Sequence, residues 1–145
     1  MEATITNTAV ITANVVTPIT VRETINAEEQ SLLTITKSVS PVPVTENGTL
    51  TYTFVIQNLG NTAATEETGV VITDTFNPVL KSLTATFNGT AWTEGADYTY
   101  DEITGMLASV AGKITVPAAT YTQDTTTGAW GINPGVSTLV ISGTV

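Results

Sequence analysis

One stretch of the chain reads Thr49-Leu50-Thr51-Tyr52-Thr53-Phe54-Val55-Ile56-Gln57, with a large apolar side chain at every second position. Successive side chains of a β-strand point to opposite faces of a sheet, so this alternation predicts a strand that is buried on one face. Threonine fills most of the positions between the apolar residues, and threonine is favoured on pleated sheets. The stretch therefore predicts a half-buried strand.

Six further stretches have the same period and are rich in Val, Ile, Thr, Tyr and Phe. They are residues 19–25, 32–39, 69–76, 83–87, 113–116 and 136–145. Turn sequences separate many of them, among them Asn47-Gly48, Asn88-Gly89, Thr104-Gly105 and Asn133-Pro134-Gly135. Residues 118–130 are rich in Thr and predict a long hairpin or a surface loop. Many short strands with a turn about every ten residues predict an all-β protein of antiparallel sheets, a sandwich or a barrel.

The composition excludes several classes of function. The 145 residues are about one domain's worth of chain and include no cysteine and no histidine. Disulfides, thiolate chemistry and the usual zinc or haem ligands are therefore excluded. The net charge of −9 would repel a nucleic acid, and no segment has the ~18 apolar residues that span a bilayer. We expect no enzyme activity, no cofactor, no nucleic-acid partner and no membrane insertion.

The body of the chain carries four motifs in the order of a known family. They are LTITKSV at residues 33–39, NGTLTYTFVIQNLGN at 47–61, VVITDTF at 70–76 and NPGVSTLVI at 133–141. Over about residues 32–145 the chain resembles the repeat of bacterial and archaeal surface proteins known as domain of unknown function eleven. The resemblance implies an immunoglobulin-like antiparallel β-sandwich, with a jelly-roll-like arrangement as a variant, in a cell-envelope or appendage protein without enzyme activity.

One departure from that family predicts how the chain is organised. Members usually end in a strand resembling I-T-N-T-A-x-V, whereas this sequence stops at Val145 and carries the motif at its front, as TITNTAVITA in residues 4–13. We therefore predict an N-terminal donor-strand arm at residues 1–25, a linker at 26–31 and an incomplete sandwich body at 32–145. An incomplete sandwich exposes an apolar groove and unpaired backbone groups, so the groove has to be filled.

The arm is the predicted occupant of that groove. The predicted donor residues are Ile5, Asn7, Ala9, Ile11, Ala13 and Val15. The predicted acceptor residues are Leu50, Tyr52, Phe54, Ile72, Leu139 and Ile141. Mass action favours filling the groove within one chain. Strand geometry opposes it, because the connection would have to travel back about 30 Å, one strand length.

We therefore predict a structural subunit of a self-assembling extracellular fibre, such as a pilus or an appendage of a cell or spore surface. Its partners would be identical subunits, joined head to tail by strand addition. The alternative is a monomeric adhesin-like or stalk module of a surface protein, which closes its sandwich in cis and binds through its loops. Residues 1–7 do not resemble a secretory signal peptide.

Three smaller sets of residues suggest chemistry of their own. Lys37, Asp74 and Asn7 form the set that some Gram-positive pilins use for a spontaneous Lys–Asn isopeptide bond. A Lys37 that snorkels from an edge strand and an Asn7 that bonds a local backbone group are far more common in proteins. Four acidic side chains could gather around calcium, a cation that prefers oxygen ligands, or simply line a solvated loop. They are Glu94, Asp97, Asp101 and Glu102. Asn47 and Asn88 match the glycosylation sequon and are also Asn-Gly turns.

Overall fold

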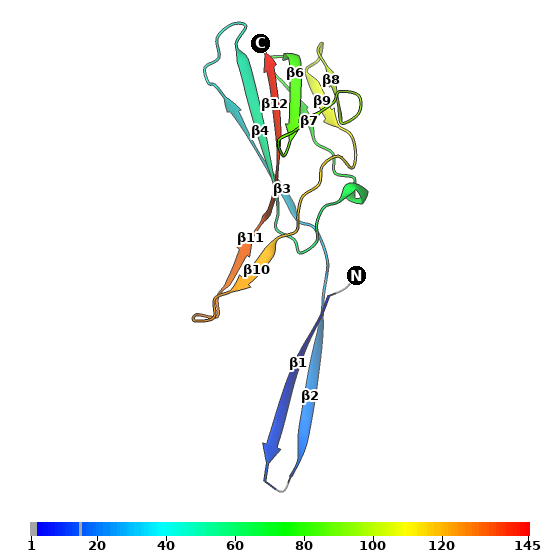
Figure 1. The fold of residues 1–145 in the computed structure, drawn as a ribbon, viewed down its shortest axis with the longest axis vertical. Coiled ribbons are helices and arrows are strands. Elements are labelled where there is room, and N and C mark those ends of the chain that lie inside the picture. Colours follow the sequence, from blue (N-terminus) through cyan, green and yellow to red (C-terminus); the bar gives the residue numbers. More distant parts are fainter. Residues whose placement is uncertain (1–2, 15) are drawn as a thin grey trace. The chain divides into compact units, whose positions relative to one another are not determined.

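The computed structural model describes residues 3–14 and 16–145, without the side chains of residues 3–5, 7, 13, 16 and 23–27. The chain is an all-β protein, as the alternating sequence predicts (Figure 1). It divides into two compact units, Met1–Gln30 and Ser31–Val145, and the boundary falls inside the predicted linker. No segment in the described part forms a helix long and apolar enough to cross a membrane.

The first unit is a β-hairpin, which we call the N-terminal hairpin. Its strands are β1 (Ala3–Ala13) and β2 (Val16–Ala27), and they form a two-stranded antiparallel sheet. Ala9 lies opposite Val21 and Ile11 lies opposite Ile19, with an irregularity in the register after Ile11. A two-stranded hairpin is marginally stable in water unless it packs against something else. By this rule we expect the N-terminal hairpin to be stabilised by further contacts.

The second unit, which we call the sandwich, is built on a five-stranded antiparallel sheet in the order β3-β4-β12-β6-β7. These strands are β3 (Leu33–Ser40), β4 (Thr49–Asn58), β12 (Gly135–Thr144), β6 (Lys81–Phe87) and β7 (Thr90–Trp92). In the two central strands, β4 and β12, buried residues alternate with more exposed ones, which confirms the predicted period of two. Leu139 of β12 lies between Phe54 of β4 and Phe87 of β6.

A second, three-stranded sheet closes the core. Its order is β5-β9-β8, and its strands are β5 (Thr73–Thr75), β9 (Met106–Ser109) and β8 (Tyr98–Asp101). Phe76, which follows β5, packs its ring 4.7 Å from the ring of Tyr52 and 6.1 Å from that of Tyr100. Leu107 of β9 and Leu139 of β12 are fully buried in the same cluster. The two sheets therefore share one apolar core, as in a β-sandwich.

Parts of the sequence prediction need correction. Residues 113–116 do not form a strand; Val116 makes an isolated bridge to Ala64, and Ile114 and Val116 fill the core from a loop. Of the predicted strand at residues 69–76, β5 takes up three residues. Residues 118–130 do contribute to a hairpin, formed by β10 (Thr120–Gln123) and β11 (Trp130–Asn133). A short 3-10 helix, η1 (Glu66–Thr68), precedes β5.

A buried amide fixes the end of the sandwich at which the chain comes in from the linker. Asn58, which is fully buried, accepts hydrogen bonds at Oδ1 from the amides of Leu32 and Gly60, both at 2.9 Å. Its Nδ2 donates to the carbonyls of Thr62, at 2.7 Å, and Pro117, at 3.1 Å. Both donors and both acceptor positions of the Asn58 side chain are thus used. This amide ties Leu32 to two loops at one end of the sheet.

Candidate functional site

One side of the sandwich is open. β3 ends the strand order of the five-stranded sheet, and its residues Ile35 and Val39 lie opposite Ile56 and Tyr52 of β4. Directly opposite residues of an antiparallel pair point to the same face, so both side chains face inward. Ile56 and Tyr52 are 3% and 7% exposed, whereas Ile35 and Val39 are 51% and 39% exposed. The inner face of β3 is therefore incompletely covered.

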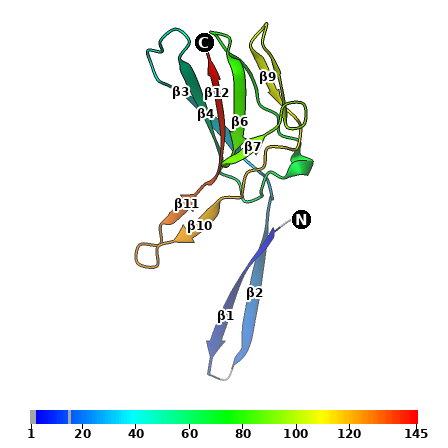
Figure 2. The same ribbon diagram turned by 45° about the horizontal axis from the view of Figure 1, so that its top comes forward.

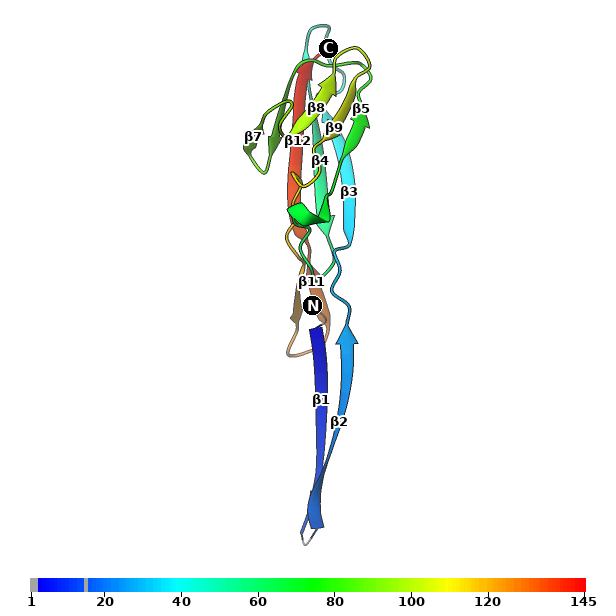
Figure 3. The same ribbon diagram turned by 90° about the vertical axis from the view of Figure 1, so that its right-hand side faces the viewer.

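The uncovered face borders an apolar groove. A pocket of about 160 Å³ lies between β3, Ile56 and residues 70–72, which lead into β5. Its lining is Leu33, Thr34, Ile35, Ile56, Val70, Val71 and Ile72. Val71 is 47% exposed. β3 and β5 run along the same side of the sandwich, so this groove separates the outer strands of the two sheets (Figure 3).

An ion pair bridges the two sheets beside this groove. The ammonium group of Lys37, on β3, lies against the carboxylate of Asp74, on β5. The same ammonium lies 4.7 Å from the centre of the Tyr52 ring and 5.3 Å from that of Phe76, close enough for cation–π attraction. Lys37 thus points inward, and the structure brings it together with Asp74. The side chain of Asn7 lies outside the described residues, so the isopeptide bond stays a prediction.

The N-terminal hairpin has two chemically different faces. The register of β1 and β2 places Ala9, Ile11, Ile19 and Val21 on one face, which we call the apolar face. The opposite face of the same register is mainly threonine. Among the described side chains it carries Thr6, Thr8, Val10, Thr12, Thr20 and Arg22. Ile11, Ile19 and Val21 are 68%, 58% and 61% exposed. The apolar face is therefore largely uncovered.

The predicted donor residues lie on the N-terminal hairpin, whereas the predicted acceptor residues lie in the core of the sandwich. Ala9 and Ile11 share the apolar face, and Ile5, Asn7 and Ala13 belong to β1, although their side chains are not described. Val15 lies outside the described residues. The acceptor set is between 0% and 9% exposed, because these six side chains already pack within the sandwich core. The acceptor set consists of Leu50, Tyr52, Phe54, Ile72, Leu139 and Ile141. The uncovered apolar surface lies one strand further out, at β3.

The four acidic residues of the calcium prediction do not form a common site. Among the described side chains, no three Asp or Glu residues are grouped so that they could hold a metal ion. Asp97 accepts hydrogen bonds from the amide of Thr93 and from Lys113, and these hold its pKa below the ordinary value. The amide of Ile103 and the hydroxyl of Thr104 likewise lower the pKa of Asp101. The structure therefore contradicts the calcium prediction: Asp101 is bonded within its own turn, and Asp97 is bonded to its own turn and to Lys113.

The outer end of the acidic segment is also tied to its surroundings. Glu102 accepts a hydrogen bond at Oε1 from the amide of Ser82, at 3.3 Å. Glu94 forms an isolated bridge with Tyr98 through the backbone. Burial raises the pKa of the Tyr98 and Tyr100 hydroxyls. The segment is thus partly core and partly solvated turn, which agrees with the second interpretation of its sequence.

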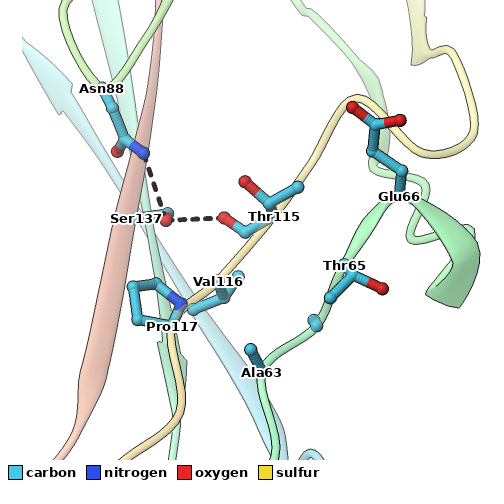
Figure 4. Close-up of a pocket in the computed structure, with 9 residues that line it drawn as sticks. Ala63, Thr65, Glu66, Asn88, Thr115, Val116, Pro117 and Ser137 are labelled. Atoms are coloured by element: carbon cyan, nitrogen blue, oxygen red, sulfur yellow. Dashed lines mark hydrogen bonds between the residues drawn. The ribbon is translucent and has the colours of Figure 1, made fainter.

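A larger pocket on the sandwich offers no evident chemistry. It has a volume of about 370 Å³ and is lined by residues 63–66, Asn88, 115–117 and Ser137. The Ser137 hydroxyl donates to the carbonyl of Thr115, at 2.7 Å, and accepts from Nδ2 of Asn88, at 3.2 Å (Figure 4). Among the described residues of the lining, Glu66 is the only ionisable one. The serine is held by structural hydrogen bonds rather than activated by a base.

Comparison of the chain with protein-family models, with curated proteins and with solved structures found no match. The resemblance to the surface-protein repeat, and with it the immunoglobulin-like arrangement, therefore stays a prediction.

Proposed function

We propose that the chain is a structural subunit of an extracellular fibre, in which the N-terminal hairpin of one copy covers the open side of the sandwich of the next. The observation that carries this proposal is that one chain has both an open sheet edge and a separate hairpin with an uncovered apolar face. The role is structural, without enzyme activity, and belongs to a cell or spore surface.

The two surfaces match in chemistry. Ile35, Val39 and Val71 on the sandwich and three aliphatic side chains on the hairpin are 39–68% exposed. Residues 3–21 contain no charged side chain, although the whole chain has a net charge of −9. Two copies would repel each other over most of their surfaces, and this uncharged segment can approach without that repulsion. Apolar burial would favour contact at the open side.

The apolar gain from covering both surfaces is of the same order as the free-energy cost of association. Covering the exposed half of six aliphatic side chains contributes about 1 kcal/mol each, or roughly 6 kcal/mol in all. If β1 pairs along the free edge of β3, each ladder hydrogen bond adds about 0.5–1.5 kcal/mol. These gains are opposed by the loss of translational and rotational freedom. The contact should therefore depend on concentration and be sensitive to a single charge placed in it.

Such a contact would not close on itself. The surface that is offered, the hairpin, differs from the surface that receives it, so the contact is heterologous. Repeated head to tail, it produces an open filament unless the rotation between copies happens to close a ring. Strand addition to an exposed sheet edge is a known mode of protein recognition.

Two substitutions at neighbouring positions of β1 test the proposal. Val10 and Ile11 are similarly exposed, at 57% and 68%, and lie on opposite faces of the hairpin. We expect filaments of the full chain in negative-stain microscopy, and we expect the Val10→Asp variant to form them as well. The Ile11→Asp variant should stay monomeric, because its carboxylate would be buried without a partner.

The controls separate the ways in which this can fail. Both variants add one negative charge to the same strand, so a difference between them cannot come from net charge. If both variants assemble like the original chain, the apolar face is not the contact. A full chain that stays monomeric in size exclusion at all concentrations would refute the fibre and favour a sandwich that is closed by its own hairpin.

A further inference from the structure

The β10–β11 hairpin carries a third uncovered apolar surface. Its register pairs Tyr121 with Ile132 and Gln123 with Trp130, so these four side chains share one face, which we call the hairpin platform. Tyr121, Trp130 and Ile132 are 48%, 69% and 48% exposed. The opposite face carries residues such as Thr120 and Thr122. A face with two aromatic side chains and an isoleucine is unusual for solvent exposure on one short hairpin.

The hairpin projects from a defined end of the sandwich. β11 runs into β12 with Pro134 alone between them, and β10–β11 extends beyond the five-stranded sheet (Figure 2). The hydroxyl of Tyr121 donates to the carbonyl of Leu59 at 2.6 Å, and the amide of Leu59 donates to the carbonyl of Leu32 at 2.8 Å. The base of this hairpin thus lies where the chain from the N-terminal hairpin joins the sandwich.

Charge argues for a second copy of the chain as the occupant of the platform. In residues 120–133 the one ionisable acid is Asp124, and its carboxylate accepts hydrogen bonds from the amides of Thr126 and Thr127 in the turn. These bonds, that from Thr127 first, hold the pKa of Asp124 below its ordinary value. The platform is therefore uncharged in a chain of net charge −9. It resembles residues 3–21 in this respect.

We propose that the hairpin platform packs against the same copy that receives the N-terminal hairpin of its chain. This inference rests on the proposed function. The receiving copy has to lie next to the N-terminal hairpin, which is tethered at Leu32. The base of β10–β11 lies at that same tether, because Tyr121 is bonded to Leu59 and Leu59 to Leu32. The platform therefore begins beside the point through which the receiving copy is held.

Trp130 is the reporter for this contact. In the full-length Trp92→Phe variant it is the one remaining tryptophan, because the chain has two. We expect its emission to shift to shorter wavelength in filaments, and we expect acrylamide quenching to fall at least threefold relative to the monomer. Trp92 stacks on Phe87 at 5.2 Å, so the thermal unfolding of the Trp92→Phe variant has to be checked against that of the original chain.

Two substitutions on opposite faces of the hairpin provide the second measurement. Ile132→Asp should raise the critical concentration for assembly at least tenfold, and Thr122→Asp, which adds the same charge on the other face, should change it less than threefold. Equal effects of the two substitutions would overturn the inference. So would a Trp130 that is quenched as easily in filaments as in monomers, and in that case the platform would be free for a ligand from outside the fibre.

The experiment separates this inference from the proposed function. If filaments form and depend on Ile11 but leave Trp130 exposed, the inference fails and the fibre subunit stands. If Trp130 becomes protected in the Ile11→Asp variant, the platform associates independently of the N-terminal hairpin, and its link to the receiving copy is wrong. If the original chain never assembles, both the inference and the proposed function fail.

Discussion

Replacing Ile35 with aspartate tests whether the open side of the sandwich is the surface that receives the N-terminal hairpin. Ile35 faces inward from β3, opposite Ile56, and is 51% exposed in the single chain. Full burial of an isoleucine contributes about 1.5–3 kcal/mol, so its present half-burial contributes roughly 1 kcal/mol to folding. Ile35→Asp should therefore lower the melting temperature of the monomer by only a few degrees.

The effect on assembly should be much larger. The variant loses the other half of the apolar burial, and it places a carboxylate without a partner in a groove lined mainly by aliphatic side chains. An unsatisfied buried polar group costs about 1–3 kcal/mol, and more if it is charged. The sum of roughly 2–4 kcal/mol corresponds to a rise of about 30- to 1,000-fold in the critical concentration.

The assay is the critical concentration measured by light scattering and pelleting, and the matched control is Ile103→Asp. Ile103 is 91% exposed and lies in the turn that follows β8. The Ile103→Asp variant undergoes the same change of side chain and charge, and we expect its critical concentration for assembly to change less than threefold. An Ile35→Asp variant that is folded and assembles at the same concentration as Ile103→Asp would refute the assignment of the open side as the receiving surface.

Three further predictions concern the stability of the sandwich and the nature of its contacts. Asn58→Ala leaves four backbone groups, buried or partly buried, without their partner and should cost about 2–4 kcal/mol, seen as a melting temperature about 10 °C lower in calorimetry. The pKa values of Asp97, Asp101 and Asp124 are lowered by folding, so their ionised forms stabilise the folded chain. This contribution to the free energy of unfolding is complete above the carboxyl pKa of the unfolded chain and is lost as the pH falls through the pKa of the folded chain. Stability to urea should thus be level from pH 8 to about 5 and fall below about pH 4. Filaments should dissociate into monomers of unaltered mass in boiling detergent, because the apolar and ladder contacts of the proposed junction are noncovalent; resistant ladders that have lost one ammonia per junction would instead establish the predicted bond between Lys37, which lies beside Asp74, and Asn7.

The central strands of the sandwich could be predicted from the sequence because their environment is symmetric. β4 and β12 have a paired strand on each side and most of their inward positions are apolar, so the alternation of residues 49–57 directly reports burial. β3 has the same alternation in Leu33, Ile35 and Val39, but a pattern of side chains does not reveal whether a strand has one neighbour or two. The six predicted acceptor residues are core positions, and one of them, Ile72, also lines the groove beside β3.

Other features depended on contacts between distant segments. Ile114 and Val116 are apolar because a loop fills the core with them, and a short apolar run of this kind does not distinguish a loop from a strand. Both strands of the N-terminal hairpin have the expected composition, but no Asn-Gly sequence lies between them to indicate that they pair. The sequence does not predict the hairpin platform, because Trp130 and Ile132 lie far from Tyr121 in the sequence and come together only through the register of β10 and β11.

The position of Lys37 explains how a chain with an open sheet edge could avoid indiscriminate association. Natural sheets protect their edges with, among other devices, charged residues that point inward, because an arriving strand would have to bury the charge. Lys37 is such a residue, at the middle of β3, and its ammonium is already paired with Asp74 and surrounded by aromatic rings. A uniformly apolar strand would cover this polar pair without offering it a hydrogen bond. The predicted donor set has one polar member, Asn7, among aliphatic residues. A strand that places this amide opposite Lys37 would offer the ion pair a hydrogen bond. A shift of two residues along β3 would bring Ile5 or Ala9 there instead. The same contact that discourages foreign strands would therefore fix the register of the donor strand.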